Sequence, residues 1–287
     1  MDSRNLKNLA LALLVLISSS AIAQDRKEPR IALTLGEVHD ELLVAVNKSG
    51  RTQRALLTVL KDSKPTHLLV AHSNDGLIGL VGYPQMTGSN KNSLLIRARH
   101  LFVSDSVALV QFECPRDVQN DCQDLYRRSD ALVEDVGALL EMVKKKIDFS
   151  RVSHIGHLGG AVNAAVLAGK GGVDATVLLA PPDPYHDKAA FTGARAFLDL
   201  PLRDLKSRVL VVSHEDTECP IASHDNSERI ARGVAFITVT GYSQIDQANR
   251  RPCAHLSMHG FIGREREVGF AVLNFIEGIG SPPKEIK

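Results

Sequence analysis

The chain has 287 residues, of which 34 are basic and 33 acidic, and its formal net charge is +1. This balance gives neither the basic surface that binds nucleic acid nor one that binds an anionic membrane, so neither partner is expected. The length suits one α/β domain, because no Pro/Ser-rich linker, repeat or low-complexity tract divides it.

The first residues have the pattern of a secretory signal peptide. Arg4 and Lys7 precede an apolar run from Leu9 to Ile17, which is too short to span a bilayer. Small residues end at Ala23, so we predict cleavage before Gln24; an uncleaved N-terminal anchor is the alternative. The expected protein is therefore periplasmic or secreted.

The predicted domain plan is simple. Residues 1–23 are the signal peptide and residues 24–287 a single domain. Within that domain, residues 24–64 contribute N-terminal strands and residues 65–287 form the core.

Hydrophobic periodicity predicts strands that alternate with helices. Short aliphatic and β-branched runs predict strands at 31–35, 41–46, 53–60, 68–70, 107–115, 151–156, 174–182, 207–216 and 234–242. Apolar residues on one helical face predict helices at 124–147, 159–168, 222–232 and 264–279. Continuous apolar strands are typical of sheets covered on both faces. We therefore predict a doubly wound, mostly parallel α/β sheet with helices on both faces and a minimal cover at 182–205, and ligands beyond the carboxyl ends of the strands.

The segment G-H-L-G-G at 156–160 has the glycine spacing of a strand-turn-helix elbow, G-x-S-x-G. Glycines on both sides let the chain turn sharply and present the central residue, usually a serine nucleophile. Leu158 stands at that position, and a hydrocarbon side chain can neither attack a carbonyl nor give up a proton. We expect the turn either to relax or to keep its shape with Leu158 filling the pocket floor. The alternative is a glycine-rich turn in another α/β fold.

Several motifs beyond the elbow follow in a recognisable order. They are "AHSNDG" after the first buried strand, "NSLLIRARHLF", "FECPRD", "VLVVSHEDTEC" and "PCAHLSMHGF". From about Thr66 to its end the chain resembles the α/β-hydrolase superfamily, especially a branch of exported bacterial members. That resemblance implies the chain order nucleophile, acid, histidine.

The resemblance also assigns site residues. It places the catalytic histidine at His259 and, with the cysteine of "DTEC" as anchor, the acid at Thr217, so Asp216 is only a doubtful acid. The backbone of Gly159 and of the "AHSNDG" loop, at His72 and Ser73, supplies the expected oxyanion-hole donors.

The four cysteines suit an exported protein with paired thiols, and they allow three pairings. Local pairing predicts Cys114–Cys122 and Cys219–Cys253. A zinc site is the rival interpretation, but no CxxC spacing supports it.

Other hydroxyl groups are weaker candidates for a nucleophile. Ser153 lies inside a predicted buried strand, where a structural role is expected. Ser73 and Ser257 lie in predicted turns, where serine commonly bonds to local backbone.

A metal interpretation rests on convergence of His72, His157 and His259 with Asp75 or Asp216. No H-E-x-x-H pattern supports it, and no G-x-G-x-x-G follows the first buried strand. Neither a metal nor a nucleotide cofactor is predicted.

Two functional hypotheses follow. The favoured one is a pseudo-hydrolase that binds a small molecule in the inherited pocket or contacts another protein. The alternative is an active esterase or amidase in which His259 works with an unusual nucleophile such as Ser73, or with metal-bound water.

Overall fold

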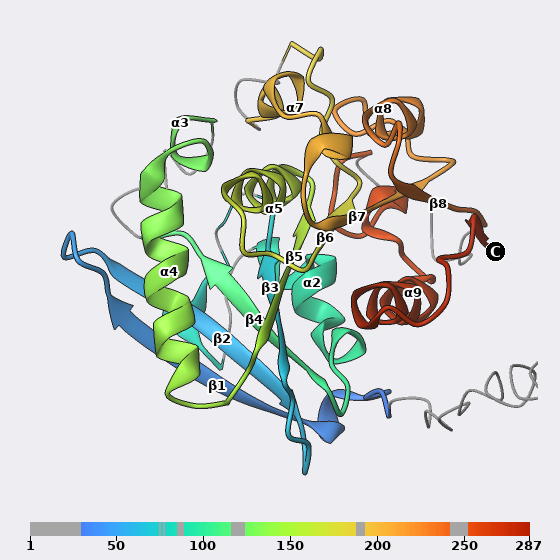
Figure 1. The fold of residues 1–287 in the computed structure, drawn as a ribbon. Coiled ribbons are helices and arrows are strands. Elements are labelled where there is room, and N and C mark those ends of the chain that lie inside the picture. The colour runs from blue at the N-terminus through green and yellow to red at the C-terminus, as the bar shows by residue number, and fades with distance from the viewer. Residues whose placement is uncertain are drawn as a thin grey trace, which may run out of the picture.

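The computed structural model describes residues 30–74, 76, 78–84, 89–115, 124–187, 193–241 and 252–287. A single nine-stranded sheet runs through the molecule, with helices on either side (Figure 1). The predicted signal peptide, Asp75 and Cys122 lie outside the described residues.

The sheet has the order β1-β2-β4-β3-β5-β6-β7-β8-β9. Its strands are β1 (Val38–Val46), β2 (Thr52–Leu60), β3 (His67–His72), β4 (Val107–Glu113), β5 (Arg151–His157), β6 (Ala175–Leu179), β7 (Arg208–His214), β8 (Ala235–Val239) and β9 (Glu285–Ile286). β2 pairs antiparallel with both β1 and β4, and all pairs from β4 to β9 are parallel. The predicted doubly wound, mostly parallel sheet is confirmed, and its carboxyl edge carries the loops that follow β3, β5, β7 and β8.

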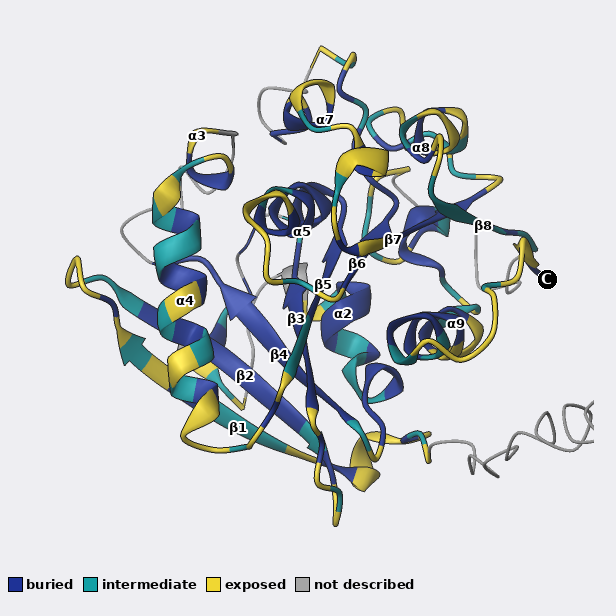
Figure 2. Ribbon diagram, in the orientation of Figure 1, coloured by how far each residue is buried: buried dark blue, intermediate teal, exposed yellow. Residues whose placement is uncertain are grey.

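Helices pack on both sheet faces because the strands are apolar on both. The helices are α2 (Leu94–Arg97), α3 (Asp124–Arg127), α4 (Asp130–Lys144), α5 (Gly159–Lys170), α7 (Ala196–Asp199), α8 (His224–Ile230) and α9 (Glu265–Glu277). One face packs against α4 and α5, and the other against α2 and α9. Figure 2 shows α5 and the neighbouring central strands as largely buried. The elbow between β5 and α5 therefore lies deep in the molecule.

Two local predictions differ from the structure, and one strand was not predicted. Residues 31–35 form no strand: Ile31 makes an isolated bridge, and a 3₁₀ helix follows at Leu35–Glu37, since the leucines at 33 and 35 are exposed and give no strand a buried face. The helix predicted at 124–147 is two helices, because Ser129 between them has an extended backbone and its hydroxyl donates to the Tyr126 carbonyl of α3. The two-residue strand β9 is too short to give a periodic signal.

No helix among the described residues combines the length and apolarity needed to cross a bilayer.

Candidate functional site at the strand-to-helix elbow

The elbow keeps the sharp geometry that its glycines allow. β5 ends at His157, α5 begins at Gly159, and Leu158 between them has φ 51° and ψ −123°. A Cβ on Gly156 would lie 2.1 Å from the Gly160 carbonyl oxygen, and one on Gly160 would lie 2.0 Å from that of His72. Only glycine fits at these two positions, so the packing around the turn fixes its shape.

Leu158 is part of the core. Its side chain is 1% exposed and belongs to the apolar cluster that contains Ile155, Leu179 and Phe261. Its N–H donates to the Leu179 carbonyl at 3.0 Å, and its own carbonyl accepts from Ala161 N at 2.8 Å. The turn has not relaxed, and a hydrocarbon fills the place from which an elbow presents its central side chain.

The predicted oxyanion donor at Gly159 already has an acceptor. Its N–H donates to Asn74 Oδ1 at 3.1 Å. Arg127, 1% exposed, fixes both partners, because its guanidinium donates to the carbonyls of Asn74 and Gly159 and to Asn163 Oδ1. A side-chain oxygen thus occupies the donor that would hold a developing negative charge.

The other two expected oxyanion residues lie at the end of β3, which His72 closes and Ser73 follows. His72 Nε2 is 2.9 Å from His154 Nδ1, and the two rings stack with centroids 5.2 Å apart. Burial lowers the pKa of His72 well below its usual value and that of His154 to about 3, so both rings are neutral at pH 7. The Ser73 hydroxyl is buried without a hydrogen-bond partner among the described residues.

His259 lies on the short 3₁₀ helix η8 (Met258–Gly260) and is fully buried. Its Nδ1 is 2.6 Å from Ser257 Oγ and 3.2 Å from the Pro252 carbonyl. The Ser257 hydroxyl donates its one proton to the Pro252 carbonyl at 2.9 Å, so we assign the imidazole proton to Nδ1. The Nε2 atom is then unprotonated, with its lone pair available, and it has no hydrogen-bond partner within the described part of the chain.

His157 packs the histidine turn against the elbow. Its ring stacks on that of His259, with centroids 5.4 Å apart and planes 9° apart, and its Nε2 donates to the His259 carbonyl at 2.9 Å. Arg97 secures the same turn by donating to the Gly260 carbonyl at 2.7 Å, while pairing with Glu265 at 2.9 Å. Burial lowers the pKa of His157 well below its usual value and that of His259 to about 4.

The predicted acid segment lies at the end of β7. Asp216 is exposed, and its backbone N–H donates to His214 Nδ1 at 3.1 Å. Thr217 Oγ1 accepts from Cys219 N at 3.4 Å. Among the described contacts, none joins either side chain to His259. The Nδ1 atom of that histidine instead meets neutral oxygens.

A disulfide joins the acid segment to the histidine segment. The predicted Cys219–Cys253 bond is confirmed, and it closes a loop with a sequence separation of 34. A loop of that size is worth about 4 kcal/mol in the chain-entropy model. Cys114 is also disulfide-bonded; its predicted partner Cys122 is outside the described residues.

The histidines do not converge on a metal within the described residues, where no three metal-ligating side chains gather. His72 pairs with His154 on the sheet face that carries α5, whereas His157 pairs with His259 on the α9 face.

Sequence reasoning located the elbow and the histidine turn but missed Asn74 and Arg127. Asn74 lay inside the quoted oxyanion loop, where its proximity to Gly159 was the available signal. Arg127 gave none, because a single arginine in a polar segment is ordinarily solvated.

Comparison with solved structures identifies the fold. The structure superposes on an esterase domain from Rhodothermus marinus (TM-score 0.54, 14% identity, 84% of this chain and 100% of that one). It also superposes on an α/β serine hydrolase homologue from Coxiella burnetii (0.52, 16%, 82% and 96%) and on a protein of unknown function from Agrobacterium tumefaciens (0.55, 13%, 85% and 100%). No protein-family model and no curated protein sequence matches the chain. The chain has the α/β-hydrolase fold, and at these identities the likeness is one of fold.

Proposed function

We propose that this is an exported α/β-hydrolase-fold protein that has lost serine-hydrolase chemistry and acts by binding a small ligand or another protein. The observation that carries the proposal is the buried Leu158 at the centre of a fully formed elbow. The scaffold that presents a nucleophile is kept, while the side chain at the nucleophile position is a hydrocarbon that cannot attack.

The surroundings of two residues, Gly159 and His259, also support a non-catalytic centre. Asn74 Oδ1 accepts the hydrogen bond of the Gly159 N–H, the donor that would stabilise an oxyanion. His259 Nδ1 contacts Ser257 and the Pro252 carbonyl, and among the described residues no carboxylate contacts this ring to stabilise the imidazolium that general-base catalysis would create.

Export to the periplasm or outside the cell is part of the proposal. The N-terminal pattern of residues 1–23 and the Cys219–Cys253 disulfide both support it, since disulfides persist in oxidising compartments.

The test is an assay with short-chain nitrophenyl esters, combined with labelling by a fluorophosphonate probe. The wild-type protein should neither turn over the esters nor take up the probe, whereas a working serine esterase assayed alongside should do both. A probe adduct mapped to any serine of this chain would overturn the proposal.

Substitution at the elbow sharpens the test. Leu158→Ser should stay about 10⁴-fold below an intact triad, because loss of the acid alone costs about that factor. Adding Asn74→Ala frees the Gly159 N–H and should raise any residual rate by about 10²-fold, the value of one oxyanion donor. Full esterase activity in Leu158→Ser alone would show that the acid and the oxyanion donors are intact.

A second candidate is an esterase or amidase in which His259 activates a different hydroxyl. Ser257 Oγ lies 2.6 Å from His259 Nδ1, whereas the Ser73 hydroxyl has no partner among the described residues. Activation of Ser257 requires the other tautomer of His259, in which Nδ1 is unprotonated and accepts the hydroxyl proton that Ser257 otherwise donates to the Pro252 carbonyl. Against it, Ser257 is 5% exposed. This function requires that His259→Ala and Ser257→Ala each abolish a measurable activity; retention in either variant excludes it.

A further inference from the structure

A cavity of about 210 Å³ lies away from the elbow, between the cover segment and α8. Its walls come from residues 184–185, from residues 197–203, which include part of α7, and from residues 226–232 in and after α8. None of its lining residues belongs to the elbow, to the oxyanion loop or to the histidine turn. Any ligand bound there would be separate from the site that the fold inherits.

Three arginines line this cavity: Arg203, Arg229 and Arg232. Within the described part of the chain, Arg229 and Arg232 form no ion pair with a carboxylate. Arg203 reaches only its neighbour Asp204, at 3.7 Å, and both side chains are about two-thirds exposed (67% and 63%), so this pair contributes little. The cavity therefore has an excess of positive charge that the described residues leave uncompensated.

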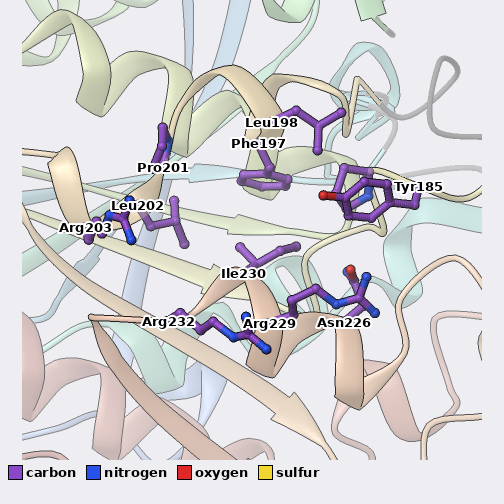
Figure 3. Close-up of a pocket in the computed structure, with 11 residues that line it drawn as sticks. Tyr185, Phe197, Leu198, Pro201, Leu202, Arg203, Asn226, Arg229, Ile230 and Arg232 are labelled. Carbon is purple, nitrogen blue, oxygen red and sulfur yellow. The ribbon is translucent and has the colours of Figure 1, made fainter.

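One of these arginines is held by an aromatic ring rather than by an acid. The Arg229 guanidinium lies 5.5 Å from the centroid of the Tyr185 ring, although Tyr185 is 65% exposed. Figure 3 shows the two side chains at one end of the cavity. A guanidinium that stacks through its face keeps the N–H donors around its edge available. Tyr185 thus orients Arg229 without consuming its hydrogen-bonding capacity.

Arg203 is positioned by close backbone approach. Gly233 follows α8 with φ +87°, and a Cβ there would lie 3.2 Å from Arg203 Cβ. The stem of Arg203 therefore packs against the turn after α8, and it brings the cover segment and the helix end together.

The rest of the lining is apolar, with one polar exception. Phe197, Leu202 and Ile230 lie in the middle of the cavity in Figure 3. Asn226 also lines it, fully buried, and neither atom of its side-chain amide has a hydrogen-bond partner in the described structure. A buried amide without partners is costly, and a bound polar group would relieve that cost.

We propose that this cavity is a binding site for a small organic anion with a compact aromatic body, such as an aryl carboxylate. The arginines supply charge-assisted hydrogen bonds to the anionic group. The apolar middle and Tyr185 take the hydrocarbon part, and Asn226 offers a donor and an acceptor to a polar atom of the ligand. The small volume, below that of common drug-sized sites, limits the body to about one ring.

The test is isothermal titration calorimetry of the disulfide-bonded protein with four probes: benzoate, phenyl phosphate, inorganic phosphate and benzyl alcohol. The two aryl anions should bind at least about tenfold more tightly than inorganic phosphate, which lacks the ring, or benzyl alcohol, which lacks the charge. Absence of benzoate and phenyl phosphate binding at millimolar concentration overturns the proposal. Equal affinity for either single-feature probe also overturns it.

Variants locate the site. Arg229→Gln and Arg232→Gln should each weaken benzoate binding by about tenfold, the value of one charge-assisted hydrogen bond. Arg266→Gln is the matched control, because it removes the same charge from an exposed position on α9 and should leave affinity unchanged. Circular dichroism checks that each variant folds. If either Arg229→Gln or Arg232→Gln does not fold, Arg203→Gln is measured in its place. Binding that is equally strong in the folded cavity variants and in the control rejects the cavity as the site.

The outcome is independent of the proposed loss of hydrolase chemistry. Ester turnover concerns the elbow and His259, whereas benzoate binding concerns residues of the cover segment and α8. Either proposal can fail while the other stands.

Discussion

Leu158 occupies a strained backbone conformation although its side chain has no catalytic group. Its positive φ costs about 1–3 kcal/mol for a residue with a Cβ. Burying a leucine side chain returns about 1.5–3 kcal/mol, and Leu158 is 1% exposed. The two effects are of similar size, so packing of the hydrocarbon is sufficient to offset the strain.

This balance predicts that Leu158→Ala is strongly destabilising. Alanine keeps the Cβ and therefore the strain, but it loses the buried methyl groups and leaves a cavity, so the free energy of unfolding should fall by about 2–5 kcal/mol. Urea denaturation followed by circular dichroism measures it. Leu125→Ala is the control, since Leu125 on α3 is 79% exposed and its loss should change stability by less than about 0.5 kcal/mol. Equal effects of the two substitutions would mean that Leu158 is not packed as described.

At the same scale, sequence reasoning succeeded where a residue type is tied to local geometry. Gly156 is forced by the Gly160 carbonyl within the turn, and Gly160 by the His72 carbonyl of β3, where the strand meets the helix. Every elbow of this kind needs both glycines, so their spacing alone located it. Asn74 and Arg127 act across long sequence separations on Gly159, and no local pattern encodes such contacts. The sequence therefore could not predict that the Gly159 N–H donates to Asn74.

At the scale of elements, the junction of β5 and α5 depends on backbone approach rather than on side chains. A Cβ at position 160 would overlap the His72 carbonyl at the end of β3, and backbone cannot move aside without disturbing the sheet. The strand, the turn and the first residues of the helix are one rigid unit for this reason.

Gly160→Ala should therefore lower the free energy of unfolding by at least about 3 kcal/mol or prevent folding. Gly137→Ala is the matched control inside α4, where a Cβ would meet nothing within 4 Å. That substitution should be neutral or stabilise by up to about 1 kcal/mol, because alanine has the higher helix propensity. Comparable denaturation midpoints for the two variants would contradict the described elbow. If Gly160→Ala gives no folded protein, the ratio of its soluble yield to that of Gly137→Ala provides the comparison.

The element pattern itself was largely readable from the sequence. The strands β3, β4, β6 and β7 contain continuous apolar runs, and such runs indicate buried strands directly. The failures came where tertiary contacts decide: Ser129 interrupts an apolar helical pattern that continues on both sides of it, and Glu285–Ile286 forms β9 only by pairing with β8.

At the scale of the whole molecule, buried neutral histidines are concentrated around the carboxyl edge of the sheet. Burial lowers the pKa of His72 and His157 well below the usual value, of His154 to about 3 and of His259 to about 4. At low pH, a protonated imidazole would have to be buried as a cation in the folded protein. The unfolded chain accepts those protons freely, so acid favours unfolding.

The lowered pKa values of these histidines determine how the free energy of unfolding changes with pH. Folded-state pKa values lie below the unfolded value of about 6.5, so the stability they contribute is present above pH 6.5 and is lost as the pH falls toward 4. Between pH 6.5 and 5 most carboxylates remain ionised, and histidine dominates the slope. Each buried histidine adds at most about 1.4 kcal/mol per pH unit there. The free energy of unfolding, measured by urea titration at pH 7, 6 and 5, should thus fall steeply.

A pair of variants separates the buried rings from the exposed ones. His154→Gln removes one proton acceptor of the unfolded chain whose folded pKa is about 3, so the slope of stability against pH should decrease by up to about 1.4 kcal/mol per unit, whatever the variant costs at pH 7. His39→Gln changes an exposed residue of β1 and should leave the slope as it is. An unchanged slope in His154→Gln, or stability that rises on acidification, would mean that these rings are hydrated in the native protein rather than sealed in its core.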